Sequence, residues 1–202
     1  MTRREPPLDE KVALIGGSLS RRGVPHAFGG ALALAYYAEP RSTIDIDLNV
    51  FVAPSSAALA LDALREAGAG GERRAAERAV RAHGQARIRW GSTPVDLFFS
   101  TDPFHDACAA GARQVPFGPD RIAILAPEHL IVCKAAFDRR KDWIDIEQML
   151  FLMAVEIDLG EIRTWLHAML GLRDRRTRRF ERAVRTVLDP EESGRYPKRP
   201  VM

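Results

Sequence analysis

Two aspartates in the first quarter of the chain, Asp45 and Asp47, have the spacing of a paired carboxylate site. They alternate with Ile44, Ile46 and Leu48, and this period of two predicts a half-buried β-strand with both carboxylates on one face and the apolar side chains in the core. Two neighbouring carboxylates repel each other, and a divalent cation such as Mg²⁺ removes that cost, together with substrate phosphate oxygens. The pattern therefore predicts metal-dependent chemistry on a phosphate compound.

A third acid and a glycine pair extend this pattern. Asp96 stands in an apolar segment, VDLFF over 95–99, which predicts another strand. A third carboxylate is the usual companion where two metal ions lie about 3.5–4 Å apart for in-line displacement. Gly29 and Gly30 lie between a predicted strand and a predicted helix, where a backbone without Cβ atoms can approach an anion closely. Together with the paired aspartates, these residues indicate a phosphate-binding catalytic site.

The elements that must position these residues form a mixed α/β half followed by an all-helical half. Apolar segments of the right length and period predict strands at 24–28, 44–50, 86–90, 95–100, 115–117 and 121–125. The third and fourth of these flank GSTP and should form a β-hairpin. Helical spacing predicts helices at 9–19, 31–38, 56–67, 75–83, 102–112, 128–137, 141–155, 159–170 and 173–188. We therefore expect a catalytic core over 1–126 and a C-terminal helical region over 127–202.

Length and composition exclude several classes of protein. The chain has 202 residues, of which 46% are hydrophobic and 28% charged, a globular balance that excludes a mostly disordered chain. No apolar run approaches the roughly 18 residues of a membrane span, and the N-terminus lacks the apolar core of a signal peptide. Cys108 and Cys133 are too few for a disulfide framework or a cysteine zinc site. We expect a soluble cytoplasmic protein with no membrane partner.

Positive charge is concentrated at the C-terminal end. The formal net charge is +3, whereas residues 172–202 alone carry ten basic and five acidic side chains. The arginine-rich segment RDRRTRRFERAVR over 173–185 could track a nucleic-acid backbone, or it could be a solvated helix face. The tail from Asp189 is rich in proline, glycine and charge, and we expect it to be loose.

The glycine pair, the paired acids and the third acid together make the sequence resemble the DNA polymerase β-like nucleotidyltransferase superfamily. The matching residues are Gly29-Gly30, Asp45-Ile46-Asp47-Leu48 and Asp96. The resemblance implies an α/β (α+β) fold, in which a small polymerase β-like core with a mixed sheet precedes a C-terminal helical region. It also implies that the protein moves a nucleotidyl group from a nucleoside triphosphate (NTP) to an acceptor hydroxyl, with the help of Mg²⁺ or Mn²⁺.

Within this superfamily the sequence looks most like the AbiEii/AbiGii toxin-type nucleotidyltransferases. The narrower resemblance rests on RSTIDID over 41–47 and on PEHLIVCKAAFDRRKDWIDIEQML over 127–150. In the toxin group a helix-borne lysine and a downstream aspartate complete the active site. Lys134 matches the lysine, and either Asp142 or Asp145 matches the aspartate, with Asp145 the better match. The acceptor implied is RNA, at the acceptor end of tRNA, and the implied protein partner is a cognate antitoxin.

The resemblance also implies a role for each matching residue. The metal ligands would be Asp45, Asp47 and Asp96, and Lys134 and Asp145 would join them in catalysis. The nucleotide would be bound by Gly29, Gly30, Arg41, Thr43 and Lys134. Many relatives have Gly-Ser, often followed by lysine, where this chain has Gly30-Ala31-Leu32. Either Arg41 compensates for the missing groups, or the chain binds the triphosphate more weakly or uses another nucleotide.

Other functions fit the same residues. The acceptor could be a small molecule such as an aminoglycoside, or a protein hydroxyl. An acidic acceptor cleft would favour an aminoglycoside, whereas a basic groove would favour RNA. The chain could also be a degenerate transferase kept as a nucleotide-binding or regulatory module. Intact carboxylates argue against that last possibility, because a retired site has no need for so costly a cluster.

The site residues also have purely structural interpretations. The paired aspartates, and Asp96 after Pro94, could lie on edge strands that face water. Lys134 could be an exposed helix lysine paired with Asp138 at i+4. The downstream aspartates could belong to a salt-bridged surface, and Arg41 could be a structural partner of the acidic strand.

Overall fold

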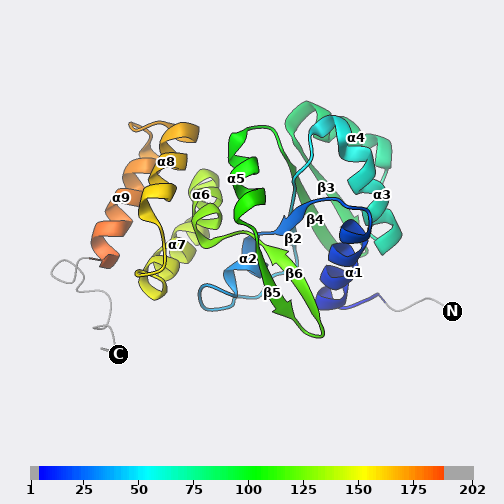
Figure 1. Cartoon of the computed structure of the whole chain (residues 1–202), viewed down its shortest axis with the longest axis horizontal. Coiled ribbons are helices and arrows are strands. Elements are labelled where there is room, and N and C mark those ends of the chain that lie inside the picture. The colour runs from blue at the N-terminus through cyan, green and yellow to red at the C-terminus, as the bar shows by residue number, and fades with distance from the viewer. Residues whose placement is uncertain (1–4, 189–202) are drawn as a thin grey trace. The chain divides into compact units, whose positions relative to one another are not determined.

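The computed structural model describes residues 5–188, and the chain divides into two compact units (Figure 1). The first comprises Met1–Ala33 and Arg41–Ala126, and the second comprises Leu34–Pro40 and Pro127–Met202. The tail expected to be loose, from Asp189 onward, lies outside the described residues.

A six-stranded mixed sheet forms the centre of the first unit, with strand order β3-β4-β2-β1-β6-β5. The strands are β1 (His26–Phe28), β2 (Ile46–Val50), β3 (Gln85–Trp90), β4 (Thr93–Phe99), β5 (Arg113–Phe117) and β6 (Asp120–Ile124). Strand β2 pairs with β4 in parallel and β1 with β6 in parallel, while the other neighbours are antiparallel. The expected hairpin is confirmed as β3 and β4. Both acid-bearing strands lie inside the sheet, so the edge-strand interpretation of the aspartates is wrong.

One face of this sheet carries the core of the first unit. Alternate residues of β2, β3 and β4 are buried there: Ile46, Leu48, Val50, Ala86, Ile88, Trp90, Val95, Leu97 and Phe99. The helices of the unit are α1 (Leu8–Arg21), α3 (Ala57–Ala67), α4 (Arg73–His83) and α5 (Pro103–Gly111), and a 3₁₀ turn covers Pro54–Ser56. Helix α1 is linked to α3 by a 2.8 Å hydrogen bond from Ser18 Oγ to the Ala63 carbonyl.

The helix expected over 31–38 is shorter than its sequence predicts. Helix α2 covers only Gly30–Leu34. The backbone N–H groups of Tyr37 and Ala38 both donate to the Leu34 carbonyl at 2.9 Å, so the chain closes a tight turn instead of continuing the helix. The residues after this point belong to the second unit until Pro40.

From Pro127 onward the described part of the second unit is helical, as the sequence predicted for this part of the chain. Its helices are α6 (Pro127–Phe137), α7 (Arg140–Leu152), α8 (Leu159–Leu170) and α9 (Arg175–Leu188). Trp143, Met149, Leu166 and Phe180 are fully or nearly fully buried in this unit. Among the helices of residues 5–188, none combines the length and the apolar character that crossing a membrane would require.

Candidate active site

Asp47 and Asp96 lie side by side on neighbouring strands of the first unit. The parallel register of β2 and β4 pairs Asp47 with Asp96, and the antiparallel register of β3 and β4 pairs Asp96 with Arg87. Directly paired residues point to the same face of a sheet, with Cβ atoms about 5 Å apart. We call these three residues the charged row. The row lies on the face opposite the apolar core.

The charged row is open to solvent toward β3. The side chain of Arg87 is 63% exposed and that of Asp96 is 19% exposed. Asp47 is half-buried, whereas its chain neighbours Ile46 and Leu48 are buried on the other face. The row is therefore most accessible at Arg87 and Asp96.

Arg87 binds Asp96 with two hydrogen bonds. The guanidinium Nε donates to Asp96 Oδ1 at 2.6 Å, and Nη2 donates to Oδ2 at 2.7 Å. These hydrogen bonds, together with the charge of Asp96, raise the pKa of the Arg87 guanidinium above its usual value. Arg87 was not among the residues predicted from the sequence. The signal for it is the register of the hairpin: with the turn at Gly91 and Ser92, residue 87 pairs with residue 96.

Two glycines bring the backbone against Asp47. Gly30 has φ +55°, a left-handed conformation, and a Cβ atom there would lie 1.7 Å from Asp47 Oδ2. The Gly29 N–H donates to the Asp47 carbonyl at 2.9 Å, and a Cβ at Gly29 would lie 3.0 Å from Asn49 Nδ2. No other residue fits position 30 without moving the carboxylate, so the predicted glycine motif and the predicted acid are one structural feature.

Asp45 lies just outside strand β2, and its predicted neighbours occupy the turn before it. The Thr43 hydroxyl accepts a hydrogen bond from the Asp45 N–H at 3.2 Å, and Thr43 and Arg41 are both half-buried. The expectation that Ile44 packs in the core is wrong, because the strand begins only at Ile46 and the Ile44 side chain is 72% exposed.

Lys134 and Asp145 pair with each other inside the second unit. Lys134 Nζ donates to Asp145 Oδ2 at 2.6 Å, which links α6 to α7, and each residue is only 3% exposed. The interpretations of Lys134 as an exposed lysine and of Asp145 as a surface residue are therefore wrong. Asp138 is not the partner of Lys134, because its carboxylate accepts from Trp143 Nε1 at 2.7 Å and pairs with Arg175 at 2.5 Å.

Asp142 has a structural task at the start of α7. Its carboxylate accepts hydrogen bonds from the backbone N–H and the guanidinium of Arg139, in a reciprocal capping arrangement. It is 1% exposed, so the interpretation of Asp142 as a surface residue is wrong as well. Of the two aspartates that the resemblance offered, Asp145 is the one that contacts Lys134.

The carboxylates fit a metal ion that arrives with a phosphate compound. Within residues 5–188, no three or more histidine, cysteine, aspartate or glutamate side chains form a group that could hold a metal ion. Mg²⁺ is commonly bound by one or two carboxylates, with substrate phosphates and water completing its shell. Asp47 and Asp96 offer such a pair of oxygen donors, although both oxygens of Asp96 are bound by Arg87. The donor chemistry therefore suits a metal–nucleotide complex better than a resident ion in an all-protein cage.

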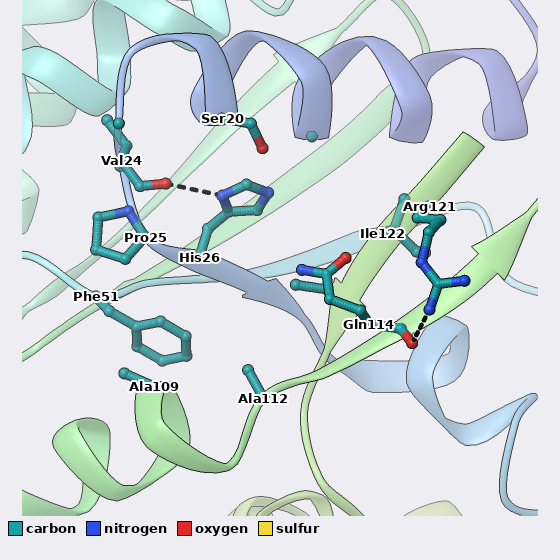
Figure 2. A pocket seen from close by; sticks show the side chains of 13 residues that line it. Ser20, Val24, Pro25, His26, Phe51, Ala109, Ala112, Gln114, Arg121 and Ile122 are labelled. Carbon is teal, nitrogen blue, oxygen red and sulfur yellow. Dashed lines mark hydrogen bonds between the residues drawn. The ribbon is translucent and has the colours of Figure 1, made fainter.

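A cavity of about 460 Å³ lies elsewhere in the first unit, and Figure 2 shows the side chains that line it. His26 donates from Nδ1 to the Val24 carbonyl at 2.9 Å, and burial lowers the pKa of its imidazole. The register that pairs Phe28 with Leu48 places His26 on the core face, opposite Asp47. None of the predicted site residues lines this cavity, so it is distinct from the charged row.

Comparison with known proteins supports the fold. No family model matches the sequence, and no curated protein has a significantly similar sequence. The chain is similar to the solved structure of the antibiotic-resistance factor ANT(2'')-Ia, with 14% sequence identity and a TM-score of 0.53. The match covers 79% of this chain and 89% of the ANT(2'')-Ia chain. An antigenic nucleotidyltransferase-like protein from Paracoccidioides brasiliensis is 15% identical, covers 88% of this chain and 92% of its own, and has a TM-score of 0.45. At these identities the likeness concerns the fold alone: the chain has a nucleotidyltransferase-like fold, a mixed α/β core followed by helices.

Proposed function

We propose that this protein is a nucleotidyltransferase that moves a nucleotidyl group from an NTP to an acceptor hydroxyl at the charged row. The observation that carries the proposal is the register that sets Asp47 beside Asp96, with Gly30 pressed against Asp47. Two carboxylates side by side on one face of a sheet repel each other, and Arg87 offsets part of that repulsion by binding Asp96. A divalent cation held between these carboxylates and the phosphates of an NTP would offset it more fully.

Asp47 and Asp96 would hold Mg²⁺ or Mn²⁺ at this site, and Asp45, just before β2, is the third ligand that the family resemblance implies. The bound metal would neutralise charge on the triphosphate and lower the pKa of the acceptor hydroxyl. Asp96 would take up the proton of that hydroxyl, whose oxygen attacks the α-phosphorus. The bond from the α-phosphorus to the bridging oxygen of pyrophosphate then breaks, and pyrophosphate leaves.

The remaining predicted residues would act on the phosphates. Gly29 and Gly30 would let the β- and γ-phosphates approach the backbone beside Asp47, and the turn with Arg41 and Thr43 would add a positive charge and a hydroxyl. Lys134 could bind phosphate only by releasing Asp145, so its catalytic role stays a prediction from resemblance.

We propose RNA as the acceptor, at the acceptor end of tRNA as in the toxin-type enzymes, with an antitoxin as the regulating partner. Helix α9 supports this choice, because its apolar side is buried and its exposed arginines form a basic face: Arg175, Arg178, Arg179, Arg182 and Arg185. Within residues 5–188, Arg182 and Arg185 form no hydrogen bond or ion pair that would have to break before they bind phosphate. Such a face neutralises nucleic-acid phosphates and releases their counterions.

The proposal is tested by transfer of label. Purified protein, Mg²⁺ and each α-labelled NTP in turn are incubated with total RNA, with the protein alone, or with a panel of aminoglycosides. Asp47→Asn is the inactive variant, and Asp106→Asn, which removes an exposed carboxylate from α5 of the same unit, is the matched control. We expect label in RNA with the wild type and with Asp106→Asn, and none with Asp47→Asn.

Other outcomes would correct the proposal in defined ways. Label on an aminoglycoside or on the protein itself would retain the reaction and change the acceptor. Equal labelling of RNA by Asp47→Asn and the wild type would contradict catalysis at the charged row. The absence of both label transfer and NTP binding would identify a degenerate member of the fold.

A further inference from the structure

The Arg87–Asp96 pair is a bidentate ion pair placed where a metal ligand is needed. Both oxygens of Asp96 are occupied by N–H groups of one guanidinium, at 2.6 and 2.7 Å. With Arg87 in contact, the charged row has a net charge of about −1, and without it the two carboxylates would together carry about −2. A divalent cation is attracted more strongly to the second arrangement.

We propose that Arg87 is a displaceable counter-ion of Asp96: it holds this carboxylate in the metal-free protein, competes with the metal ion for it, and leaves when a metal–nucleotide complex binds. The inference rests on the proposed function, because it concerns the order in which ligands occupy the same carboxylates. Arg87 is therefore a positioning residue that acts through Asp96.

The hairpin does not need this ion pair to fold. Strands β3 and β4 are paired without interruption from Gln85 opposite Phe98 to Trp90 opposite Thr93. The other side of β3 is anchored by buried residues, and Trp90 packs closely enough on α3 that a Cβ at Gly68 would lie 2.6 Å from its ring. Backbone pairing and core packing therefore hold β3 in place without the Arg87–Asp96 ion pair, which can break without unfolding the hairpin.

The solvent exposure of Arg87 keeps the free-energy cost of displacing it from Asp96 low. Its side chain is 63% exposed, so water can solvate the guanidinium as soon as it leaves Asp96. Solvent at the exposed guanidinium limits the contribution of this pair to about 1 kcal/mol, which corresponds to about a fivefold effect on a competing equilibrium. A divalent cation carries twice the charge of the guanidinium, so its binding to Asp96 is enough to reverse such a preference.

Mn²⁺ binding, followed by the electron paramagnetic resonance signal of the free ion, tests this competition without any catalytic turnover. The variants are Arg87→Gln, Asp96→Asn and the double variant. Arg89→Gln is the matched control, because Arg89 is exposed on the same face of β3, two residues away, and its loss changes the net charge equally. We expect Arg87→Gln to bind Mn²⁺ about fivefold more tightly than the wild type. Arg89→Gln should bind as the wild type does, and Arg87→Gln should have no effect when Asp96 is already replaced.

Three results would overturn the inference. Equal or weaker Mn²⁺ binding by Arg87→Gln would show that Arg87 does not compete with the metal. An equal gain in Arg89→Gln would show that the effect is only one of overall charge. If neither the wild type nor any variant binds Mn²⁺, with or without NTP, the metal-dependent function itself fails, and the inference fails with it.

Discussion

Two ion pairs of equal length differ in how readily their charged groups can exchange partners. Arg87 Nε lies 2.6 Å from Asp96 Oδ1 in the first unit, and Lys134 Nζ lies 2.6 Å from Asp145 Oδ2 in the second. The first pair is exposed on its arginine side, whereas both side chains of the second are only 4% exposed. Removing one partner from a buried pair leaves an unsolvated charge, while an exposed partner simply returns to water. Burial, and not bond length, decides which of these charges can exchange partners.

This difference separates residues that the family resemblance places in one active site. Asp96 can bind a metal ion because water solvates Arg87 once the guanidinium has left the carboxylate. Lys134 and Asp145 also hold α6 against α7, so any catalytic use of the lysine would be coupled to the stability of the helical unit. The predictions below test that separation.

The largest effect is expected from Lys134→Met. It removes the lysine that binds the buried Asp145 carboxylate at 2.6 Å, and breaking such a buried pair lowers the free energy of unfolding by about 3–5 kcal/mol. Urea denaturation measures the loss, and the double variant Lys134→Met/Asp145→Leu should recover part of it. A loss below about 1 kcal/mol would place this pair in the same class as an exposed one.

Asp47→Asn should affect activity strongly and stability hardly at all. Asp47→Asn removes a charged metal ligand, and a bound metal supplies several kcal/mol of transition-state stabilisation, so kcat should fall by about 10²–10³-fold. The melting temperature should stay unchanged or rise slightly, because repulsion with the neighbouring carboxylates is relieved. A clear fall in melting temperature would instead show that Asp47 is part of the framework.

Gly30→Ala should combine a moderate loss of stability with loss of activity. A left-handed non-glycine residue costs about 1–2 kcal/mol, and the new Cβ must also displace Asp47. Gly23→Ala is the matched control, because Gly23 has φ +65° and its Cβ would meet nothing within 4 Å. Both variants should lose stability, and only Gly30→Ala should lose transfer activity, as followed by label incorporation.

Arg87→Gln should have the smallest effect on stability. An exposed ion pair contributes no more than about 1 kcal/mol, so its urea midpoint should stay close to that of the wild type. If Arg87→Gln destabilised the protein as much as Lys134→Met does, the Arg87–Asp96 and Lys134–Asp145 pairs would contribute equally to stability, and our comparison would be wrong.

Local patterns predict much of the first unit. The alternation around Asp47 and the apolar segments that flank GSTP predict the strands that carry Asp47 and Asp96. Arg87 was missed because the predicted loop included Thr93 and Pro94, which belong to β4 and shift the register so that residue 87 pairs with residue 96.

Ile44 was predicted in the core because the alternation of apolar and acidic residues begins before the strand itself does. The Thr43 hydroxyl accepts from the Asp45 N–H just before β2, and a period of two does not indicate where a strand begins.

The second unit is harder to read from its sequence. Helix α6 is apolar on nearly all sides, so no polar stripe indicates which way Lys134 faces. Its partner Asp145 stands eleven positions further on, in another helix, and such a pairing depends on packing that local spacing does not encode. The inclusion of Leu34–Pro40 in this unit is equally non-local.

The most direct test of the central claim is thermal unfolding of the wild type and of Asp47→Asn with Mg²⁺ and each NTP in turn. A ligand at 100 times its Kd stabilises the folded state by about 2.7 kcal/mol, so a bound metal–nucleotide complex should raise the melting temperature of the wild type well beyond the effect of Mg²⁺ alone. We expect no such rise in Asp47→Asn. An equal rise in both proteins, or no rise with any of the four nucleotides, would contradict a nucleotide site at the charged row.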